Sequence, residues 1–261
     1  MKTRDEFFKD YLRECPIALS FWRSLECEQF AKRPAPGPVL DVGCGDGFFS
    51  RTVYGRPLEA GIDLDPKEVS RAIQRKAYQK TYQGTVNQLP FPSKSFKTII
   101  SNCVLEHVPD IDGALKEISR VLKPGGHLMI TVPSECFNTQ SFFGGIARVL
   151  GLGSFEKVYI GGLNKIFKHH HVNDARIWRK RLKKAGLQLV ETEYFVSITA
   201  FHAYERWLIP SLPSKFYKLL FGRWVITPRI LTRAWAPGLL RKSLSSKTDQ
   251  GAAYFLKARK A

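Results

Sequence analysis

The segment Val39–Gly47 constrains the fold of this chain more than any other. It reads Val-Leu-Asp-Val-Gly-Cys-Gly-Asp-Gly. The apolar start predicts a buried strand over Val39–Val42, and Phe48–Tyr54 predicts a short helix directly after the glycines. Glycine has no Cβ, so the backbone of such a loop can turn sharply and approach a ligand closely. A strand, a glycine loop and a helix in this order are typical of the nucleotide-binding corner of a doubly wound sheet.

The spacing of the glycines restricts the class of ligand that this loop can bind. A dinucleotide fingerprint has glycine at its first, third and sixth positions, but the sixth position counted from Gly43 is Phe48. The pattern from Asp41 is instead Asp-x-Gly-x-Gly-x-Gly. This pattern resembles motif I of the class I S-adenosylmethionine (SAM) methyltransferases, in particular the methyltransferase-11-like group.

Three later segments resemble the same family in the same order. Residues 84–91 read Gly-Thr-Val-Asn-Gln-Leu-Pro-Phe, where family members typically have Gly-Asp-Ala-x-x-Leu-Pro-Phe beside the adenine. Residues 102–109, Asn-Cys-Val-Leu-Glu-His-Val-Pro, follow a predicted strand. Residues 122–126 read Leu-Lys-Pro-Gly-Gly before an apolar strand. Proline and glycine there would end a helix and turn the chain.

The resemblance implies a Rossmann-like α/β fold. We expect a doubly wound, seven-stranded sheet with an antiparallel last strand. Insertions would follow strand 5 and separate strands 6 and 7. Periodicity and turn signals predict strands over 39–42, 58–64, 81–84, 98–101, 128–132, 187–195 and 252–258, and helices over 4–15, 17–30, 48–54, 66–79, 111–122 and 173–185.

The domain organisation follows from these elements. Residues 1–33 would form helices that cover the cofactor site, and residues 34–261 would form the SAM-binding domain. Within it, residues 134–170 form a glycine-rich, apolar insertion that we interpret as a substrate lid or a loose loop. Residues 195–249 form a second insertion rich in aromatic and basic residues, in which four prolines predict short pieces.

The resemblance also assigns residues to the cofactor. The glycine loop would line the methionine and ribose part of SAM, above Asp41. Asp63 lies 20 residues after Gly43, where an acidic residue can accept hydrogen bonds from both ribose hydroxyls. The complete set expected to bind SAM is Asp41, Gly43, Cys44, Gly45, Gly47, Asp63, Leu64, Thr85, Val86, Asn102 and Cys103, with Asn102 and Cys103 near the sulfonium.

Methyl transfer by direct displacement needs alignment of two reactants and no protein nucleophile. A general base, if one is used, would be His107 or His171, because imidazole titrates near neutral pH. Each also has a structural interpretation, as a residue that fixes a turn or a helix entry. We expect no metal site at His169–His171, because adjacent side chains diverge and no carboxylate or cysteine partner is apparent nearby.

Composition bears on location and partners. The five cysteines are widely spread and form no Cys-x-x-Cys pair, which favours reduced thiols in a cytoplasmic protein. No apolar signal core and no run of 18 uncharged apolar residues is present, so we expect no membrane span. The net charge is +18. A field of that sign attracts anionic lipid or nucleic acid.

Three functional hypotheses remain open. In the first, the acceptor is a lipophilic small molecule met at an anionic membrane surface, with Trp207–Ile209 and Trp224–Ile226 as shallow anchors. In the second, the protein methylates or binds RNA, although it has no separate RNA-binding module and no Asn-Pro-Pro-Tyr motif. In the third, it is a non-catalytic scaffold. The sequence indicates neither an oligomeric state nor a choice among oxygen, carbon and nitrogen acceptors.

Overall fold

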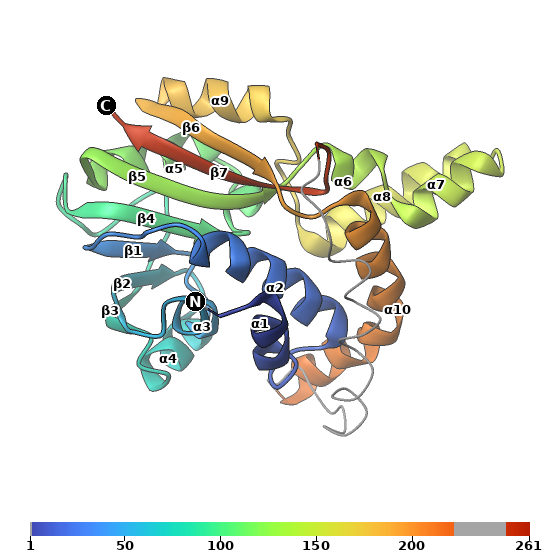
Figure 1. Ribbon diagram of the computed structural model, residues 1–261, viewed down its shortest axis with the longest axis horizontal. Coiled ribbons are helices and arrows are strands. Elements are labelled where there is room, and N and C mark those ends of the chain that lie inside the picture. Colours follow the sequence, from blue (N-terminus) through green and yellow to red (C-terminus); the bar gives the residue numbers. More distant parts are fainter. Residues whose placement is uncertain (1, 222–248) are drawn as a thin grey trace.

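A single seven-stranded sheet organises the described part of the molecule. Figure 1 presents the computed structural model, which describes residues 2–221 and 249–261. The strand order is β3-β2-β1-β4-β5-β7-β6, and β7 runs antiparallel to both of its neighbours. The strands are β1 Val39–Val42, β2 Leu58–Asp63, β3 Tyr78–Gln83, β4 Phe96–Asn102, β5 Leu122–Pro133, β6 Leu187–Tyr194 and β7 Ala253–Lys260. The predicted fold class, including the antiparallel last strand, is confirmed.

Helices cover both faces of this sheet. The helices of the described residues are α1 Arg4–Tyr11, α2 Ile17–Ala31, α3 Phe48–Tyr54, α4 Pro66–Gln74, α5 Ile111–Val121, α6 Cys136–Thr139, α7 Phe142–Val149, α8 Gly153–Phe167, α9 Ala175–Lys184 and α10 Ile198–Phe221. Of these, α7 and α8 project away from the sheet (Figure 1). A short 3₁₀ turn, η1, spans Leu105–His107.

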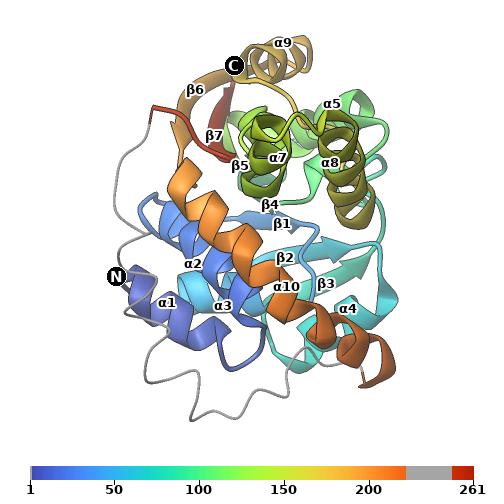
Figure 2. The same ribbon diagram turned by 90° about the vertical axis from the view of Figure 1, so that its right-hand side faces the viewer.

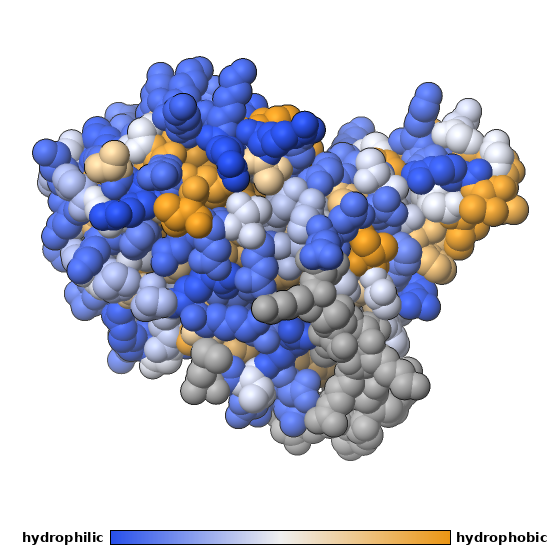
Figure 3. Space-filling view, turned by 45° about the horizontal axis from the view of Figure 1, so that its top comes forward, coloured by the Kyte–Doolittle hydropathy of each residue, from blue (hydrophilic) through white to orange (hydrophobic). Residues whose placement is uncertain are grey.

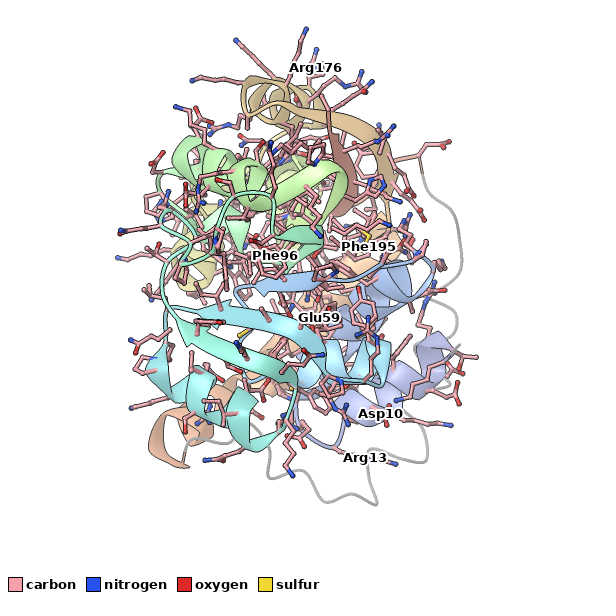
Figure 4. All side chains as sticks on the ribbon, turned by 90° about the vertical axis from the view of Figure 1, so that its left-hand side faces the viewer. Asp10, Arg13, Glu59, Phe96, Arg176 and Phe195 are labelled. Atoms are coloured by element: carbon pink, nitrogen blue, oxygen red, sulfur yellow. The ribbon has the colours of Figure 1, made fainter. Side chains whose placement is uncertain are left out.

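The two faces follow from the alternation of side chains along each strand. Val39 and Ile100 belong to a core shared with α2, α4 and α10. Their chain neighbours Leu40 and Ile99 belong to a second core with α5 and α9. Figure 4 labels Phe96, at the start of β4, whose buried side chain joins this second core. Both faces of the central strands are therefore apolar, as expected for a sheet covered on both sides.

Most predicted boundaries agree with the structure to within two residues, with three exceptions. Helix α1 ends at Tyr11, four residues before its expected end. Strand β5 begins at Leu122, six residues before its expected start, so the Lys-Pro-Gly-Gly segment that was expected to turn the chain lies within the strand.

The third exception is the junction of α4 and β3. The chain predicts a helix to about residue 79 and a strand from residue 81, but α4 ends at Gln74 and β3 starts at Tyr78. Lys76 takes a left-handed conformation (φ 51°) that breaks the helix. Tyr78 is buried, and its hydroxyl donates to Asp41 Oδ2 (2.6 Å). This contact with β1 holds the segment as strand.

The insertion after β5 is helical, so its interpretation as a loose loop is wrong. Ser141 caps α7 by accepting from the Gly144 N–H, and α7 and α8 pack against each other as a hairpin. The buried Glu205 of α10 accepts from the hydroxyls of Ser141 (2.7 Å) and Tyr159 (2.9 Å). Tertiary contacts of this kind override the low helix propensity of glycine.

The second insertion also differs from expectation. Its described part is one helix, α10, which continues through Pro210 and Pro213 and lies against α2 (Figure 2). The Trp22 ring contacts the rings of Phe201 and Tyr204. This packing offsets the cost of a proline within a helix, about 3 kcal/mol or more.

The first membrane anchor expected in this insertion lies partly in the core. Trp207 and Leu208 are partly buried and pack against the core shared by α2 and α10. The second expected anchor, 224–226, lies outside the described residues. Among residues 2–221 and 249–261, no helix combines the length and the hydrophobicity needed to cross a bilayer.

Candidate active site

The glycine loop is docked tightly between β2 and the segment after β4. The N–H groups of Gly43 and Cys44 both donate to Ile62 O (2.8 and 3.0 Å). Gly43 has φ 72°, and a Cβ there would lie 2.4 Å from Val104 Cγ2. Gly45 also has a positive φ, but a Cβ there would meet no atom within 4 Å. The loop is therefore closed on its protein side and open above Gly45, where a ligand can approach its backbone.

Asp63 stands across from this opening. Its Oδ2 accepts from the Gly45 N–H (2.8 Å) and its Oδ1 accepts from the Asp65 N–H (2.9 Å). A carboxylate has about four lone-pair sites, so both oxygens can accept a further hydrogen bond. The geometry fits the expectation that this side chain holds a sugar beside the loop.

Asp41 lies beneath the loop, as expected, and its buried carboxylate accepts two hydrogen bonds. Its Oδ2 accepts from both the hydroxyl of Ser50, on α3, and that of Tyr78, on β3. Burial raises the pKa of Asp41 to about 6, against the lowering effect of these two hydrogen bonds. Asp41 therefore ties β1 to α3 and β3 and supports the loop from below.

The expected adenine contacts lie near the ends of β2 and β3. Leu64 exposes 71% of its surface, which leaves an apolar side chain free for a flat ring. Thr85 is exposed, and its hydroxyl accepts from the Asn87 N–H (3.3 Å). The Val86 side chain is buried in the core with α5 and α9. Only the backbone of Val86 remains for a polar contact.

A largely apolar cavity of about 370 Å³ lies beside the glycine corner. We call it the acceptor cavity. The loop after β4 forms part of its wall, because Cys103 lines it and the adjacent Val104 is the residue that a Gly43 Cβ would strike. Apolar lining residues come from α2, α6, α8 and α10, including Leu19, Trp22, Phe137, Phe167, Tyr204 and Leu208.

One wall of the acceptor cavity is charged. Glu26, fully buried on α2, accepts from Arg23 (2.7 Å), from Asn102 Nδ2 (2.8 Å) and from the Cys103 thiol (2.8 Å). Burial is the largest cause of the raised pKa of the Cys103 thiol, and the Glu26 carboxylate adds to it. Asn102 and Cys103, expected near the sulfonium, therefore both donate to a buried carboxylate in the cavity wall.

Glu106 is a second buried carboxylate in this wall. Only 1% of its surface is exposed, and burial raises its pKa to about 8. Its Oε2 has no hydrogen-bond partner among the described residues. Buried polar groups are usually paired, so an orphaned carboxylate oxygen on a cavity wall is a candidate for ligand contact.

The histidines separate into two groups. His107 lines the acceptor cavity, and its Nδ1 lies 3.1 Å from Lys168 O. His169 also lines the cavity and stacks on His107, with ring centroids 5.5 Å apart. Burial lowers the pKa of both, that of His169 to about 4. His171 does not line the cavity; its Nε2 lies 2.9 Å from Val108 O, which suits a structural role.

The expectation that the histidine triplet has no carboxylate nearby is wrong. One side-chain donor atom from each of Glu106, His107 and His169 lies within 4.8 Å of the other two. The fold brings η1 against the end of α8, because the N–H groups of His170 and His171 both donate to Glu106 O (2.8 and 3.1 Å).

Comparison with known proteins identifies the domain. The family model described as "Methyltransferase domain" matches residues 40–130, which contain the glycine corner, β4 and most of β5. The chain carries a class I SAM-dependent methyltransferase domain.

Curated relatives also match part of the chain. Demethylmenaquinone methyltransferase from Tropheryma whipplei is 40% identical over 122 residues, which cover 44% of this chain and 51% of that protein. Malonyl-[acyl-carrier protein] O-methyltransferase from Serratia marcescens is 34% identical over 94 residues, or 36% of this chain and 37% of that protein. The chain thus spans about half the length, or less, of these curated relatives.

A solved structure extends the likeness of the fold beyond that domain. A SAM-dependent methyltransferase from Thermotoga maritima superposes with a TM-score of 0.59 at 18% identity, over 94% of this chain and 92% of that one. At this identity the likeness concerns the fold alone.

Three residues of the methyltransferase domain's cavity were missed by sequence reasoning: Glu26, Glu106 and His169. Glu26 sits in a mostly apolar helix, and a charged residue there was the available signal. Glu106 and His169 were visible only as members of short motifs. Their meeting depends on contacts between segments far apart in the chain.

Proposed function

We propose that this protein transfers a methyl group from SAM to a small lipophilic acceptor at an anionic membrane surface. The observation that carries the proposal is the apolar acceptor cavity, which shares the Cys103–Val104 segment with the wall of the glycine corner. Two relatives named for demethylmenaquinone and for malonyl-[acyl-carrier protein] support an acceptor with an apolar part.

The mechanism that we propose rests on alignment. SAM supplies an electrophilic methyl on a positively charged sulfur. The glycine loop and Asp63 hold the cofactor's sugar and methionine part, and the cavity holds the acceptor and excludes water. Fixing two reactants in line can account for roughly 7–11 kcal/mol of the barrier. The Glu26 carboxylate is paired with Arg23, and both line the cavity, so the two together give its wall a polar site without net charge.

The tip of the α7–α8 hairpin supports the membrane part of the proposal. Figure 3 shows an apolar projection at the right of the molecule, formed by this hairpin. Val149 exposes 87% of its surface and Val158 73%, and Leu150 and Phe155 are also exposed. Exposed clusters of this kind mark interaction surfaces.

Basic residues near the hairpin tip favour a lipid surface over another partner. Lys157 is exposed on α8 next to Val158, and the chain carries a net charge of +18. Each basic residue near an anionic bilayer contributes about 1 kcal/mol. The opposite end of α8 lines the acceptor cavity through Ile166 and Phe167, so the same helix joins the tip to the acceptor site.

The first test follows the methyl group. Purified protein is incubated with a cell extract and methyl-labelled SAM, and the label is partitioned among lipid, RNA and water-soluble fractions. We expect label in the lipid fraction. Label in RNA would favour the nucleic-acid hypothesis, and no transfer to any fraction would favour a scaffold.

The second test addresses the surface. The double variant Val149→Asp, Phe155→Asp should lose co-sedimentation with vesicles that contain anionic lipid, because it places charge where the tip would enter the bilayer. Ile73→Asp, at an apolar position on α4 that is about as exposed as Phe155, is the control and should bind as wild type does. Equal binding by the double variant would reject the tip as the docking surface.

A further inference from the structure

We infer that Glu106, His107 and His169 form a binding site for one divalent transition-metal ion on the wall of the acceptor cavity. The inference goes beyond the proposed methyl transfer and does not depend on it. Its first basis is proximity: one donor atom from each residue lies within 4.8 Å of the other two, and His107 Nε2 lies 3.7 Å from Glu106 Oε1.

The distances suit an ion after small side-chain movements. Ligands held about 2.1 Å from a tetrahedral ion are about 3.4 Å apart. The separation of His107 Nε2 and Glu106 Oε1, 3.7 Å, exceeds this by about 0.3 Å, and the other separations, which are at most 4.8 Å, exceed it by about 1.4 Å or less. Rotations of three side chains that share a cavity wall can close that gap without moving the backbone.

The second basis is the orientation of the two imidazoles. His107 Nδ1 lies 3.1 Å from Lys168 O, and His169 Nδ1 lies 3.1 Å from Asn164 Oδ1. The Asn164 amide is oriented by its own donation to Asn138 Oδ1 (2.9 Å). Both Nδ1 partners are oxygens that only accept, so each Nδ1 carries the proton and each Nε2 keeps a lone pair. Metal-binding histidines are held in this way, with the other ring N–H donating to a carbonyl or carboxylate.

The third basis is the orphaned carboxylate. Glu106 is buried and lines the cavity, and its Oε2 has no partner among the described residues. A cation beside it would satisfy an oxygen that otherwise costs free energy. The backbone also fixes the geometry, since the Glu106 carbonyl accepts from the N–H groups of His170 and His171.

The donor set selects the class of ion. Two imidazole nitrogens and one carboxylate suit zinc, iron(II) or a neighbouring transition ion, whereas magnesium and calcium prefer all-oxygen sites. Three protein ligands leave a coordination position that faces the cavity, as in catalytic zinc sites. A water molecule or an oxygen of the acceptor can take this position.

The test measures metal binding without SAM, so its outcome is separate from that of the methyl-transfer assay. Tag-free, full-length protein is stripped with a chelator and titrated with Zn²⁺ by calorimetry. Co²⁺ is then used as a spectroscopic probe. We expect one ion per chain. Glu106→Gln and His169→Ala should each weaken the affinity at least about 100-fold and abolish the cobalt absorption band.

His170→Ala is the matched control. It removes a neighbouring, exposed imidazole that does not line the cavity, and it should bind Zn²⁺ as wild type does. Circular dichroism checks the fold of each variant, and His169→Asn is a milder substitute if His169→Ala unfolds. The inference is overturned if wild type binds no ion or if the Glu106 and His169 variants bind equally well. Loss of binding in His170→Ala would also overturn it, because it would place the ion on the exposed His170.

Discussion

Replacing Asp63 by asparagine isolates the role of one carboxylate at the glycine corner. Each of its oxygens accepts from a backbone N–H, at Gly45 and at Asp65. Asparagine has nearly the same size but only one acceptor oxygen, so its NH₂ group must face one of these donors. The variant therefore disturbs the loop geometry and removes acceptor capacity for the ribose hydroxyls.

The size of the effect follows from these bonds. A hydrogen bond to a charged group contributes about 1.5–3 kcal/mol, which corresponds to a loss of affinity of roughly 10- to 150-fold. Calorimetric titration with SAM and with S-adenosylhomocysteine measures this loss. Both ligands should weaken equally, because they carry the same sugar.

Glu59→Gln provides the matched control. Glu59 lies on the same strand, and its Oε2 accepts from the Val39 N–H (2.7 Å), away from the corner; Figure 4 labels it. A glutamine oxygen can still accept that bond, so affinity for SAM should stay within about twofold of wild type. The reasoning fails if Asp63→Asn binds SAM as tightly as Glu59→Gln does.

Three further predictions concern the supports of the site. Gly43→Ala should lower the melting temperature more than Gly45→Ala, since only the former places a Cβ against Val104; equal shifts in a thermal melt would contradict the close approach. Because the pKa of Asp41 is raised in the folded state, its contribution to stability falls as the pH rises from about 4 to about 6, by up to about 3 kcal/mol. The free energy of unfolding of Asp41→Asn, measured with urea, should lack this pH-dependent component. If the free energies of wild type and variant change in parallel with pH, the prediction is refuted. Glu205→Ala should release the α7–α8 hairpin from α10 and increase proteolysis within 140–170, whereas unchanged protection would show that other contacts hold the hairpin.

Elements with strong local signals were predicted well. β1 and α3 match their expected ranges. The wrong predictions concern segments whose secondary structure depends on tertiary packing. Glycines in 134–168 favour a loop locally, and prolines in α10 favour a break, but contacts with Glu205 and α2 hold both segments as helices.

The sequence alone determined the glycine corner and the acidic residue across from it. Backbone freedom at glycine and the period of the apolar residues are local properties, so they can be read from neighbouring residues. Only the tertiary structure decided that Glu26, Glu106 and His169 line one cavity wall. These residues come from three separate parts of the chain, and their burial, hydrogen bonds and shifted pKa values arise only when α2, η1 and the end of α8 pack together.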